Sequence, residues 1–302
     1  MIAVDLGSNT IRVLEYDCIG KRATAQFEKI VKTADKLAST GVIDHTAVER
    51  VIYALKEAQE EIDFDGQEVV AVTTEAIRRA KNGSEVLARI AAETGVKFRM
   101  IDGEEEARLT LLAVKERLRK LQLQANRFVL VDIGGGSTEI VFSYEDRIFS
   151  KSFPVGIVTI AQRYETLDRI EEALADEMLS MRMYCAEIFA TKGETDAFVA
   201  TAGTPTTVAA MKLGQRYATY DAAKINGTIL YKEELRFYLK KLLDMPFQMR
   251  EETVGTGRSD LIAAGILIYE RLYSILEQER CVVIDDGLRE GVAIAACDST
   301  RL

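Results

Sequence analysis

The chain has 302 residues, of which 48% are hydrophobic, and a formal net charge of -9 at pH 7. A chain of this length and apolar content can bury one large or two medium cores, and we expect two domains. The acidic balance argues against general binding of DNA or of an anionic membrane, because either surface usually needs an excess of Lys and Arg. A polyanionic substrate would therefore need a local basic patch.

The number and spacing of cysteines and histidines exclude several kinds of active site. Cys18, Cys185, Cys281 and Cys297 are widely separated and form no close pair of the kind that binds zinc or acts as a redox couple, so we expect reduced, buried thiols. His45 is the single histidine and follows Asp44 at a helix start, which favours a solvated surface position. One histidine excludes histidine-dependent triads and two-histidine metal sites.

No basic-then-apolar leader precedes the first strand pattern, and no apolar run approaches the ~20 residues that span a bilayer. We therefore expect a cytoplasmic protein with no membrane partner.

The chain opens with a strand, a small-residue turn and a second strand. Residues 2–13 read IAVDLGSNTIRV, and residues 129–141 read VLVDIGGGSTEIV, so the acid, glycine and Ser/Thr positions recur. Glycine and other small residues between β-branched runs are typical of hairpins. The simplest explanation of this internal repeat is a pair of duplicated halves.

Helices and strands alternate after the first hairpin, which indicates α/β layers. The patterns predict a helix with Asp44 as N-cap, a strand at 69–73, a helix at 75–80, a helix capped by Ser84 through residue 94, a strand at 97–101 and a helix at about 103–121. Residues 122–127 are polar and break the last helix. We therefore predict domains 1–123 and 124–302, with a last helix that could pack back on the first domain.

The second half repeats this logic. The predicted elements are strands at 128–133, 139–143 and 147–153, a helix from about 168 to 190, and a strand at 198–201 that meets a turn and a helix start near Pro205.

Three small-residue turns at strand ends could bind phosphate, because glycine lets several backbone N–H groups approach one anion. The alternative is a set of tight turns with no ligand. The predicted substrate-binding turn residues are Gly7, Ser8, Asn9, Thr10, Gly134, Gly135, Gly136, Ser137, Gly203 and Thr204.

Asp5, Asp132 and Glu139 lie at or beside these turns. Hard carboxylate oxygens beside phosphate oxygens are a usual way to hold Mg²⁺, mostly through water, with Mn²⁺ as an alternative ion. The alternative roles are turn capping by the aspartates and a solvated glutamate.

Glu104, Glu105 and Glu106 stand together at a predicted helix start, where the helix dipole favours negative charge. A carboxylate near phosphate-binding turns could also orient and deprotonate an attacking water. The pattern alone does not say which of the three, if any, is catalytic.

Residues 74–82 concentrate three cations in four positions, including Arg78, which fits a solvated face or a substrate-binding surface. Arg12, Arg258 and Arg289 are further candidates, since guanidinium groups bind phosphate oxygens bidentately.

Taken together, these motifs resemble the exopolyphosphatase and guanosine pentaphosphate phosphohydrolase (Ppx/GppA) family of the actin-like superfamily. The similar stretches lie along the whole chain, at residues 5–10, 74–78, 105–109, 132–139, 202–204, 258–260, 264–265 and 287–291. The glycine turns alone would indicate the superfamily, whereas the glutamate stretch at 105–109 and the Gly-Leu-Arg-Glu-Gly stretch at 287–291 narrow it to this family.

The resemblance implies two duplicated actin-like (ribonuclease H-like) domains with a central interdomain cleft. It implies Glu106 as general base, Asp132 and Glu139 as the Mg²⁺ region, and the other two glutamates as bystanders. The implied reaction releases terminal phosphate from inorganic polyphosphate or the 5′ γ-phosphate of guanosine pentaphosphate, giving the tetraphosphate. The chain is similar to the short members without a helical C-terminal extension, which puts processive degradation of long polymers in doubt.

Two positions depart from the commoner family pattern. Thr10 stands where Ser is frequent but keeps the hydroxyl group, while Pro205 removes one N–H at a helix start. The loss of this N–H could remove a phosphate donor or only stiffen the turn.

Two rivals remain open. A kinase of the same superfamily would use both hairpins around ATP, with residues 202–204 as a nucleotide motif, but would transfer phosphate to an acceptor. A non-catalytic sensor of guanosine penta- or tetraphosphate would bind without turnover. A homodimer is compatible with the sequence, which also leaves the preferred polyanion undecided.

Overall fold

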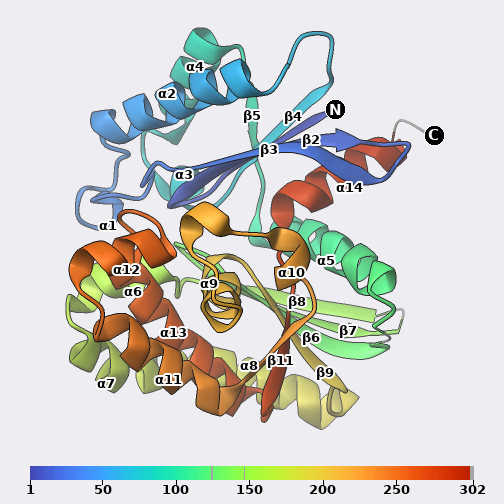
Figure 1. Cartoon of the computed structure of the whole chain (residues 1–302), viewed down its shortest axis with the longest axis vertical. Coiled ribbons are helices and arrows are strands. Elements are labelled where there is room, and N and C mark those ends of the chain that lie inside the picture. The colour runs from blue at the N-terminus through green and yellow to red at the C-terminus, as the bar shows by residue number, and fades with distance from the viewer. Residues whose placement is uncertain (124, 146, 300–302) are drawn as a thin grey trace. The chain divides into compact units, whose positions relative to one another are not determined.

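The computed structural model describes residues 1–123, 125–145 and 147–299. Its contacts divide the chain into two units (Figure 1), which we call unit 1 (Met1–Ala113 with Gly287–Leu302) and unit 2 (Val114–Asp286). The domain boundary expected between residues 123 and 124 falls on Gln124, which lies outside the described residues, so that boundary stays a prediction. The expected cleft between the domains also stays a prediction.

Unit 1 contains one sheet and its covering helices. Its elements are β1 (Ile2–Leu6), β2 (Thr10–Asp17), β3 (Arg22–Ile30), α1 (Leu37–Thr40), α2 (His45–Glu61), β4 (Val69–Thr73), α3 (Glu75–Arg79), α4 (Gly83–Thr94), β5 (Phe98–Met100), the first part of α5 (Gly103–Lys120) and α14 (Leu288–Ser299).

Unit 2 contains the second sheet. Its elements, after the end of α5, are β6 (Arg127–Ile133), β7 (Thr138–Tyr144), β8 (Arg147–Phe153), α6 (Ile157–Tyr164), α7 (Leu167–Glu177), α8 (Leu179–Lys192), β9 (Ala197–Thr201), α9 (Gly203–Lys212), the 3-10 helix η1 (Tyr217–Thr219), α10 (Ala222–Ile225), β10 (Thr228–Tyr231), α11 (Lys232–Leu243), α12 (Phe247–Val254), α13 (Ser259–Ile275) and β11 (Arg280–Val283).

The two sheets share one topology. Strand order is β3-β2-β1-β4-β5 in unit 1 and β8-β7-β6-β9-β11 in unit 2, where β10 adds an antiparallel edge. In each unit three antiparallel strands are followed by two parallel ones. The predicted α/β fold with duplicated halves and the two predicted hairpins are therefore confirmed.

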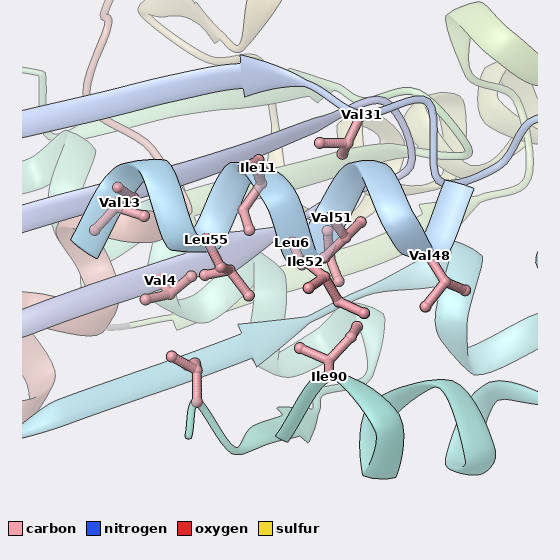
Figure 2. Close-up of a cluster of buried hydrophobic side chains, with 14 of the residues drawn as sticks. Val4, Leu6, Ile11, Val13, Val31, Val48, Val51, Ile52, Leu55 and Ile90 are labelled. Atoms are coloured by element: carbon pink, nitrogen blue, oxygen red, sulfur yellow. The ribbon is translucent and has the colours of Figure 1, made fainter. Parts of the chain in front are cut away.

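Alternation along the strands explains why unit 1 has three layers. Val4 and Leu6 of β1 join α2 and α4 in one apolar cluster (Figure 2), while Ala3 belongs to a second cluster with Leu288 and Val292 of α14. One face of the sheet therefore rests on α2 and α4, and the other on α14. Burying a Val, Leu or Ile side chain stabilises the fold by about 1.5–3 kcal/mol.

Aromatic side chains organise the core of unit 2. The ring of Phe142 on β7 makes edge-on contacts with Tyr184 and Phe189 of α8, with ring centroids 6.0 and 5.4 Å away. The ring of Phe198 on β9 lies 5.0 Å from that of Tyr273 on α13. Edge-to-face pairs of this kind add about 0.5–1.5 kcal/mol beyond area burial.

Two predicted helices differ from the structure. The helix expected at 168–190 is divided into α7 and α8 at Met178, whose φ of -98° and ψ of 9° leave the helical region. The helix expected to be capped by Ser84 begins at Gly83 after Asn82. The Asn82 side chain does not cap α4, because its amide bonds both the N–H and the carbonyl of Ile43.

The structure also corrects the prediction that all four cysteines are reduced. Cys18 and Cys297 form a disulfide within unit 1, so the expectation of reduced thiols is wrong for this pair. Their sequence separation is 279 residues, and only the fold brings β2 and α14 together. Cys185 and Cys281 are free and buried, as predicted.

His45 is on the surface, with 74% of its side chain exposed, as predicted. Among the described residues, no helix has both the length and the apolar character to cross a bilayer.

Candidate active site

The turn between β1 and β2 is closed by one backbone bond. The Gly7 N–H donates to the Thr10 carbonyl at 3.0 Å. The carbonyls of Ser8 and Asn9 point back into unit 1, where they accept N–H groups from residues 31–34, the segment that follows β3. Because that segment binds the carbonyl groups of Ser8 and Asn9, the turn is held in place from its carbonyl side.

The turn between β6 and β7 repeats this arrangement in unit 2. The Gly134 N–H donates to the Ser137 carbonyl at 2.9 Å. The carbonyls of Gly134 and Gly135 accept N–H groups from residues 157–159, the start of α6 and the segment that follows β8. Gly156 makes this approach possible, since a β-carbon there would come within 2.4 Å of the Gly135 carbonyl oxygen.

The amides at both turn tips share one property. In the described part of the chain, the N–H groups of Ser8, Asn9, Gly135 and Gly136 donate to no backbone carbonyl. Consecutive N–H groups in a small-residue turn make a concave donor set that suits an anion such as phosphate.

In each unit the turn lies at the carboxyl edge of parallel strands, where α/β sheets bind ligands. In unit 1 the Thr73 hydroxyl at the end of β4 donates to the Leu6 carbonyl at 2.8 Å, and the Ile101 N–H donates to the Thr73 carbonyl at 3.0 Å. The starts of α3 and α5 therefore lie at the same edge as the first turn. In unit 2 Thr201 pairs with Asp132, which puts the start of α9 beside the second turn.

The acids before the turns face different partners across their hairpins. Asp5 pairs with Arg12 in the register of β1 and β2, whereas Asp132 pairs with Glu139 in that of β6 and β7. Residues directly opposite on antiparallel strands share one face of the sheet. One hairpin therefore carries an acid opposite a base, and the other carries two carboxyl groups.

Arg12 is engaged within unit 1, where its Nε lies 3.1 Å from the Glu28 carboxylate. Glu139 is 1% exposed, and its Oε1 accepts hydrogen bonds from the hydroxyls of Ser137 and Ser152, both at 2.7 Å. Ser152 is absent from our predicted site, since a lone serine in a strand carries no sequence signal.

The carboxyl groups fit a weakly held magnesium ion better than a protein-only metal cage. No group of three or more His, Cys, Asp or Glu side chains in the described ranges could hold a metal. Mg²⁺ commonly binds through one or two carboxylates and keeps waters or substrate phosphates as its other ligands. Asp132 and Glu139, at one register position of unit 2, match that donor set.

The three glutamates at the start of α5 have different surroundings. Asp102 caps the helix by accepting the Glu105 N–H at 2.8 Å. Glu104 is exposed. The carboxylate of Glu105 accepts two bonds from the Arg99 guanidinium, at 2.7 and 2.9 Å, and this hydrogen bonding lowers the pKa of Glu105.

Glu106 differs from both neighbours because its Oε2 atom is buried. The role of Glu106 as general base stays a prediction.

Arg78 is positioned on α3, where the guanidinium donates to the Ile101 carbonyl at 2.6 Å and pairs with Glu75. These contacts link α3 to the end of β5. The predicted contact of Arg78 with substrate stays a prediction.

Gly203 and Arg258 come together at the start of α9. A β-carbon on Gly203 would lie 2.5 Å from Nη2 of Arg258, so the guanidinium rests on the glycine. Arg258 is 8% exposed. Thr204 is fully buried, and its Oγ1 faces the position that a β-carbon on Gly265 would take, 2.2 Å away, so Thr204 contributes packing between α9 and α13. Pro205 stands in the first turn of α9, as predicted.

The Gly-Leu-Arg-Glu-Gly stretch has a structural explanation that sequence reasoning missed. Glu290 accepts the Gly287 N–H at 2.8 Å and the Arg289 Nε–H at 2.6 Å, while Gly291 packs on the backbone of Leu109 in α5. The stretch therefore joins the start of α14 to the helix that carries Glu106. Its similarity to a stretch of the Ppx/GppA family was the available signal.

Comparisons with known proteins agree with this arrangement. The model of the "Ppx/GppA phosphatase family" matches residues 22–300. Exopolyphosphatase 1 of Mycobacterium leprae is 28% identical over 98% of this chain and 89% of its own length. Exopolyphosphatase 2 of Mycobacterium tuberculosis is 29% identical over 97% of both proteins.

Solved structures give the same result. The crystal structure of the Aquifex aeolicus Ppx/GppA family member is 30% identical, with a TM-score of 0.75 over 100% of this chain and 98% of that one. An exopolyphosphatase from Cytophaga hutchinsonii has a TM-score of 0.85 over 99% of this chain and 97% of that chain at 21% identity, which shows the shared fold. With the strand orders, these matches confirm the predicted α/β fold with duplicated halves, and the chain belongs to the Ppx/GppA phosphatase family.

Proposed function

We propose that the chain is a phosphohydrolase that releases terminal phosphate from inorganic polyphosphate, the 5′ γ-phosphate from guanosine pentaphosphate, or both. The observation that carries the proposal is the repeated turn, closed by the same bond in both units with its tip amides donating to no backbone carbonyl of the described chain. Membership of a phosphatase family and the names of the exopolyphosphatase relatives support this choice.

Glu106 is proposed as the general base. Its carboxylate would take a proton from the attacking water, which is the step that a hydrolase adds to phosphate binding. Glu105 is a poorer candidate because Arg99 lowers its pKa. The exposed Glu104 lacks a surrounding that would orient water.

The tip amides of the two turns, with Arg258 beside Gly203, are proposed to bind phosphate oxygens of the substrate. Their contribution is positioning and electrostatic stabilisation of the transferred group. We further propose Mg²⁺, with Mn²⁺ as a substitute, held by Asp132 and Glu139 of unit 2, and we keep Asp5 of unit 1 as a separate candidate ligand. The ion would supply a positive charge to the phosphate oxygens. The charge on this chain's own carboxylates would otherwise repel the substrate.

The central test is phosphate release in Mg²⁺ from polyphosphate of several lengths and from guanosine pentaphosphate. We expect Glu106→Gln to lower the rate by roughly 10²- to 10⁴-fold, as is typical for loss of a general base. Glu104→Gln is the matched control on the same helix turn and should retain nearly full activity. Full activity of Glu106→Gln together with loss in Glu105→Gln would move the role to Glu105.

The kinase alternative predicts that release depends on an acceptor. Phosphate set free with water as the only acceptor contradicts it. A sensor would instead bind guanosine pentaphosphate tightly in Mg²⁺ without turnover. Phosphate transfer that requires an acceptor other than water, or tight binding without turnover, would replace the hydrolase proposal.

A further inference from the structure

Helix α14 is attached to the sheet of unit 1 near both of its ends. At its start the Arg289 guanidinium donates to the Gln26 side chain on β3 at 3.3 Å, while the buried Glu290 carboxylate accepts local bonds from the Gly287 N–H and from Arg289. Near its end Cys297 is joined to Cys18, which directly follows β2. The helix is therefore tied to the sheet by a covalent bond as well as by packing.

The first turn of α14 touches the helix that carries Glu106. A β-carbon on Gly291 would lie 2.0 Å from the carbonyl oxygen and 2.5 Å from the carbonyl carbon of Leu109. A backbone carbonyl inside a helix cannot move aside as a flexible side chain can. Leu109 is three residues after Glu106, about one helical turn along α5. The position of α14 therefore limits where that turn of α5 can lie.

Without the disulfide, α14 keeps only non-covalent contacts. Leu288, Val292 and Ala293 share an apolar cluster with Leu109 and with Ala3 of β1. Helices shorter than about 12–15 residues are marginal on their own and depend on tertiary contacts. α14 has 12 residues, so breaking the disulfide near its end should weaken the packing of Gly291 against the backbone of Leu109 in α5.

We propose that the Cys18–Cys297 disulfide is a reversible redox device that holds α14 against α5 and thereby positions Glu106 for catalysis. The proposal rests on the proposed role of Glu106 as general base. In compartments rich in thiol reductants, disulfides that form are mostly catalytic or redox-sensing.

The chemistry is thiol–disulfide exchange with a dithiol reductant. One thiolate of the reductant attacks the sulfur of Cys18, which is the more exposed partner, and Cys297 leaves as a thiolate. The second thiol of the reductant then displaces Cys18 and closes its own disulfide. The protein gains two electrons and two protons, and the dithiol loses them.

The test compares kcat and KM of the oxidised protein with those after treatment with dithiothreitol. We expect reduction to lower kcat by about 3- to 100-fold, the range that a misplaced catalytic group can cause, with little change in KM. It should also shift the pH profile of kcat, because the surroundings of Glu106 change. Reoxidation with oxidised dithiothreitol should restore the rate.

Two variants sharpen this test. Cys18→Ser should have the reduced rate and no response to dithiothreitol. Cys185→Ala is the matched control, because this cysteine is free and buried in unit 2, and it should keep the full redox response.

Equal kcat in both redox states would overturn the proposal, and so would a lower melting temperature on reduction with unchanged kcat and pH profile. Alkylation and intact mass that show four free thiols after mild oxidation would also overturn it. The proposed function is tested separately, since Glu106→Gln must lose activity in either redox state.

Discussion

Gly291 lies so close to Leu109 that a β-carbon on it would fall 2.0 Å from the Leu109 carbonyl oxygen. Glycine is needed there for close approach and not for an unusual φ, because Gly291 has no positive φ. The helices α5 and α14, which are far apart in the sequence, can therefore pack backbone to backbone.

Replacing Gly291 with alanine should reduce the free energy of unfolding by about 1–3 kcal/mol, the usual effect of overpacking a close contact. Urea unfolding of the oxidised protein measures the change. Gly95→Ala is the control, because Gly95 has a φ of +76° but nothing within 4 Å, and should cost only about 1 kcal/mol. A smaller loss for Gly291→Ala than for Gly95→Ala would contradict the packing argument.

Arg99→Ala should raise the pKa of Glu105, because the two guanidinium hydrogen bonds are the largest cause of its lowered value. A carboxyl group whose pKa is lowered by folding stabilises the folded state at pH values above its unfolded pKa. That stabilisation is lost as the pH falls through the folded pKa. The variant should therefore lose less stability on acidification. Carboxyl NMR titration checks the pKa. Arg108→Ala is the control, since Arg108 lies 3.9 Å from Glu105 and should change it less.

Gly203→Ala should weaken substrate binding. The new β-carbon would displace the Arg258 guanidinium, whose Nη2 lies 2.5 Å from that position. Losing a charge-assisted hydrogen bond costs about 1.5–3 kcal/mol, so KM should rise by roughly 10- to 150-fold. The double variant with Arg258→Ala should be little worse than either single one. Additive losses would show that the two residues act independently.

Removing divalent ions with EDTA should abolish phosphate release, and added Mg²⁺ should restore it. Asp132→Asn should raise the Mg²⁺ concentration for half activity by at least roughly 10-fold, the lower bound for losing a group that supports a metal. Asp176→Asn, on an exposed position of α7, is the control. An unchanged Mg²⁺ requirement in Asp132→Asn would remove this residue from the metal region.

Alkaline pH should destabilise the protein. Burial raises the pKa of Tyr184 to about 12 and that of Cys185 to about 12, against ordinary values of 10.0 and 9.0. The buried, protonated forms of these two side chains stabilise the folded state fully at pH values below their unfolded pKa values. This stabilisation is lost as the pH rises toward 12, because the unfolded chain releases the two protons at lower pH than the folded chain does. Urea unfolding between pH 8 and 11 should show the decline, and Cys185→Ala should make it shallower. A flat stability profile would contradict the burial argument.

Local patterns predicted much of the fold. The two hairpins were predictable because the acid, glycine and β-branched residues that form each turn are neighbours in sequence. The duplication followed from repeating those residues, and the strand orders confirm it. The break at Met178 was not predictable, because no glycine or proline marks it.

Features that depend on distant contacts could not be predicted. The Cys18–Cys297 bond needs a fold that brings residues 279 positions apart within reach. The difference between Glu105 and Glu106 likewise depends on Arg99, which lies on another element. Sequence placed three acids at one helix start, but only their neighbours separate them.

The unequal partners of Asp5 and Asp132 bear on how the two halves diverged. A tandem copy would begin with two equivalent hairpins, and here one register position now holds Arg12 in one half and Glu139 in the other. The register partners are therefore oppositely charged in unit 1 and both acidic in unit 2. Glu139→Arg would thus give unit 2 the same pairing of an aspartate with an arginine that unit 1 has at this register position.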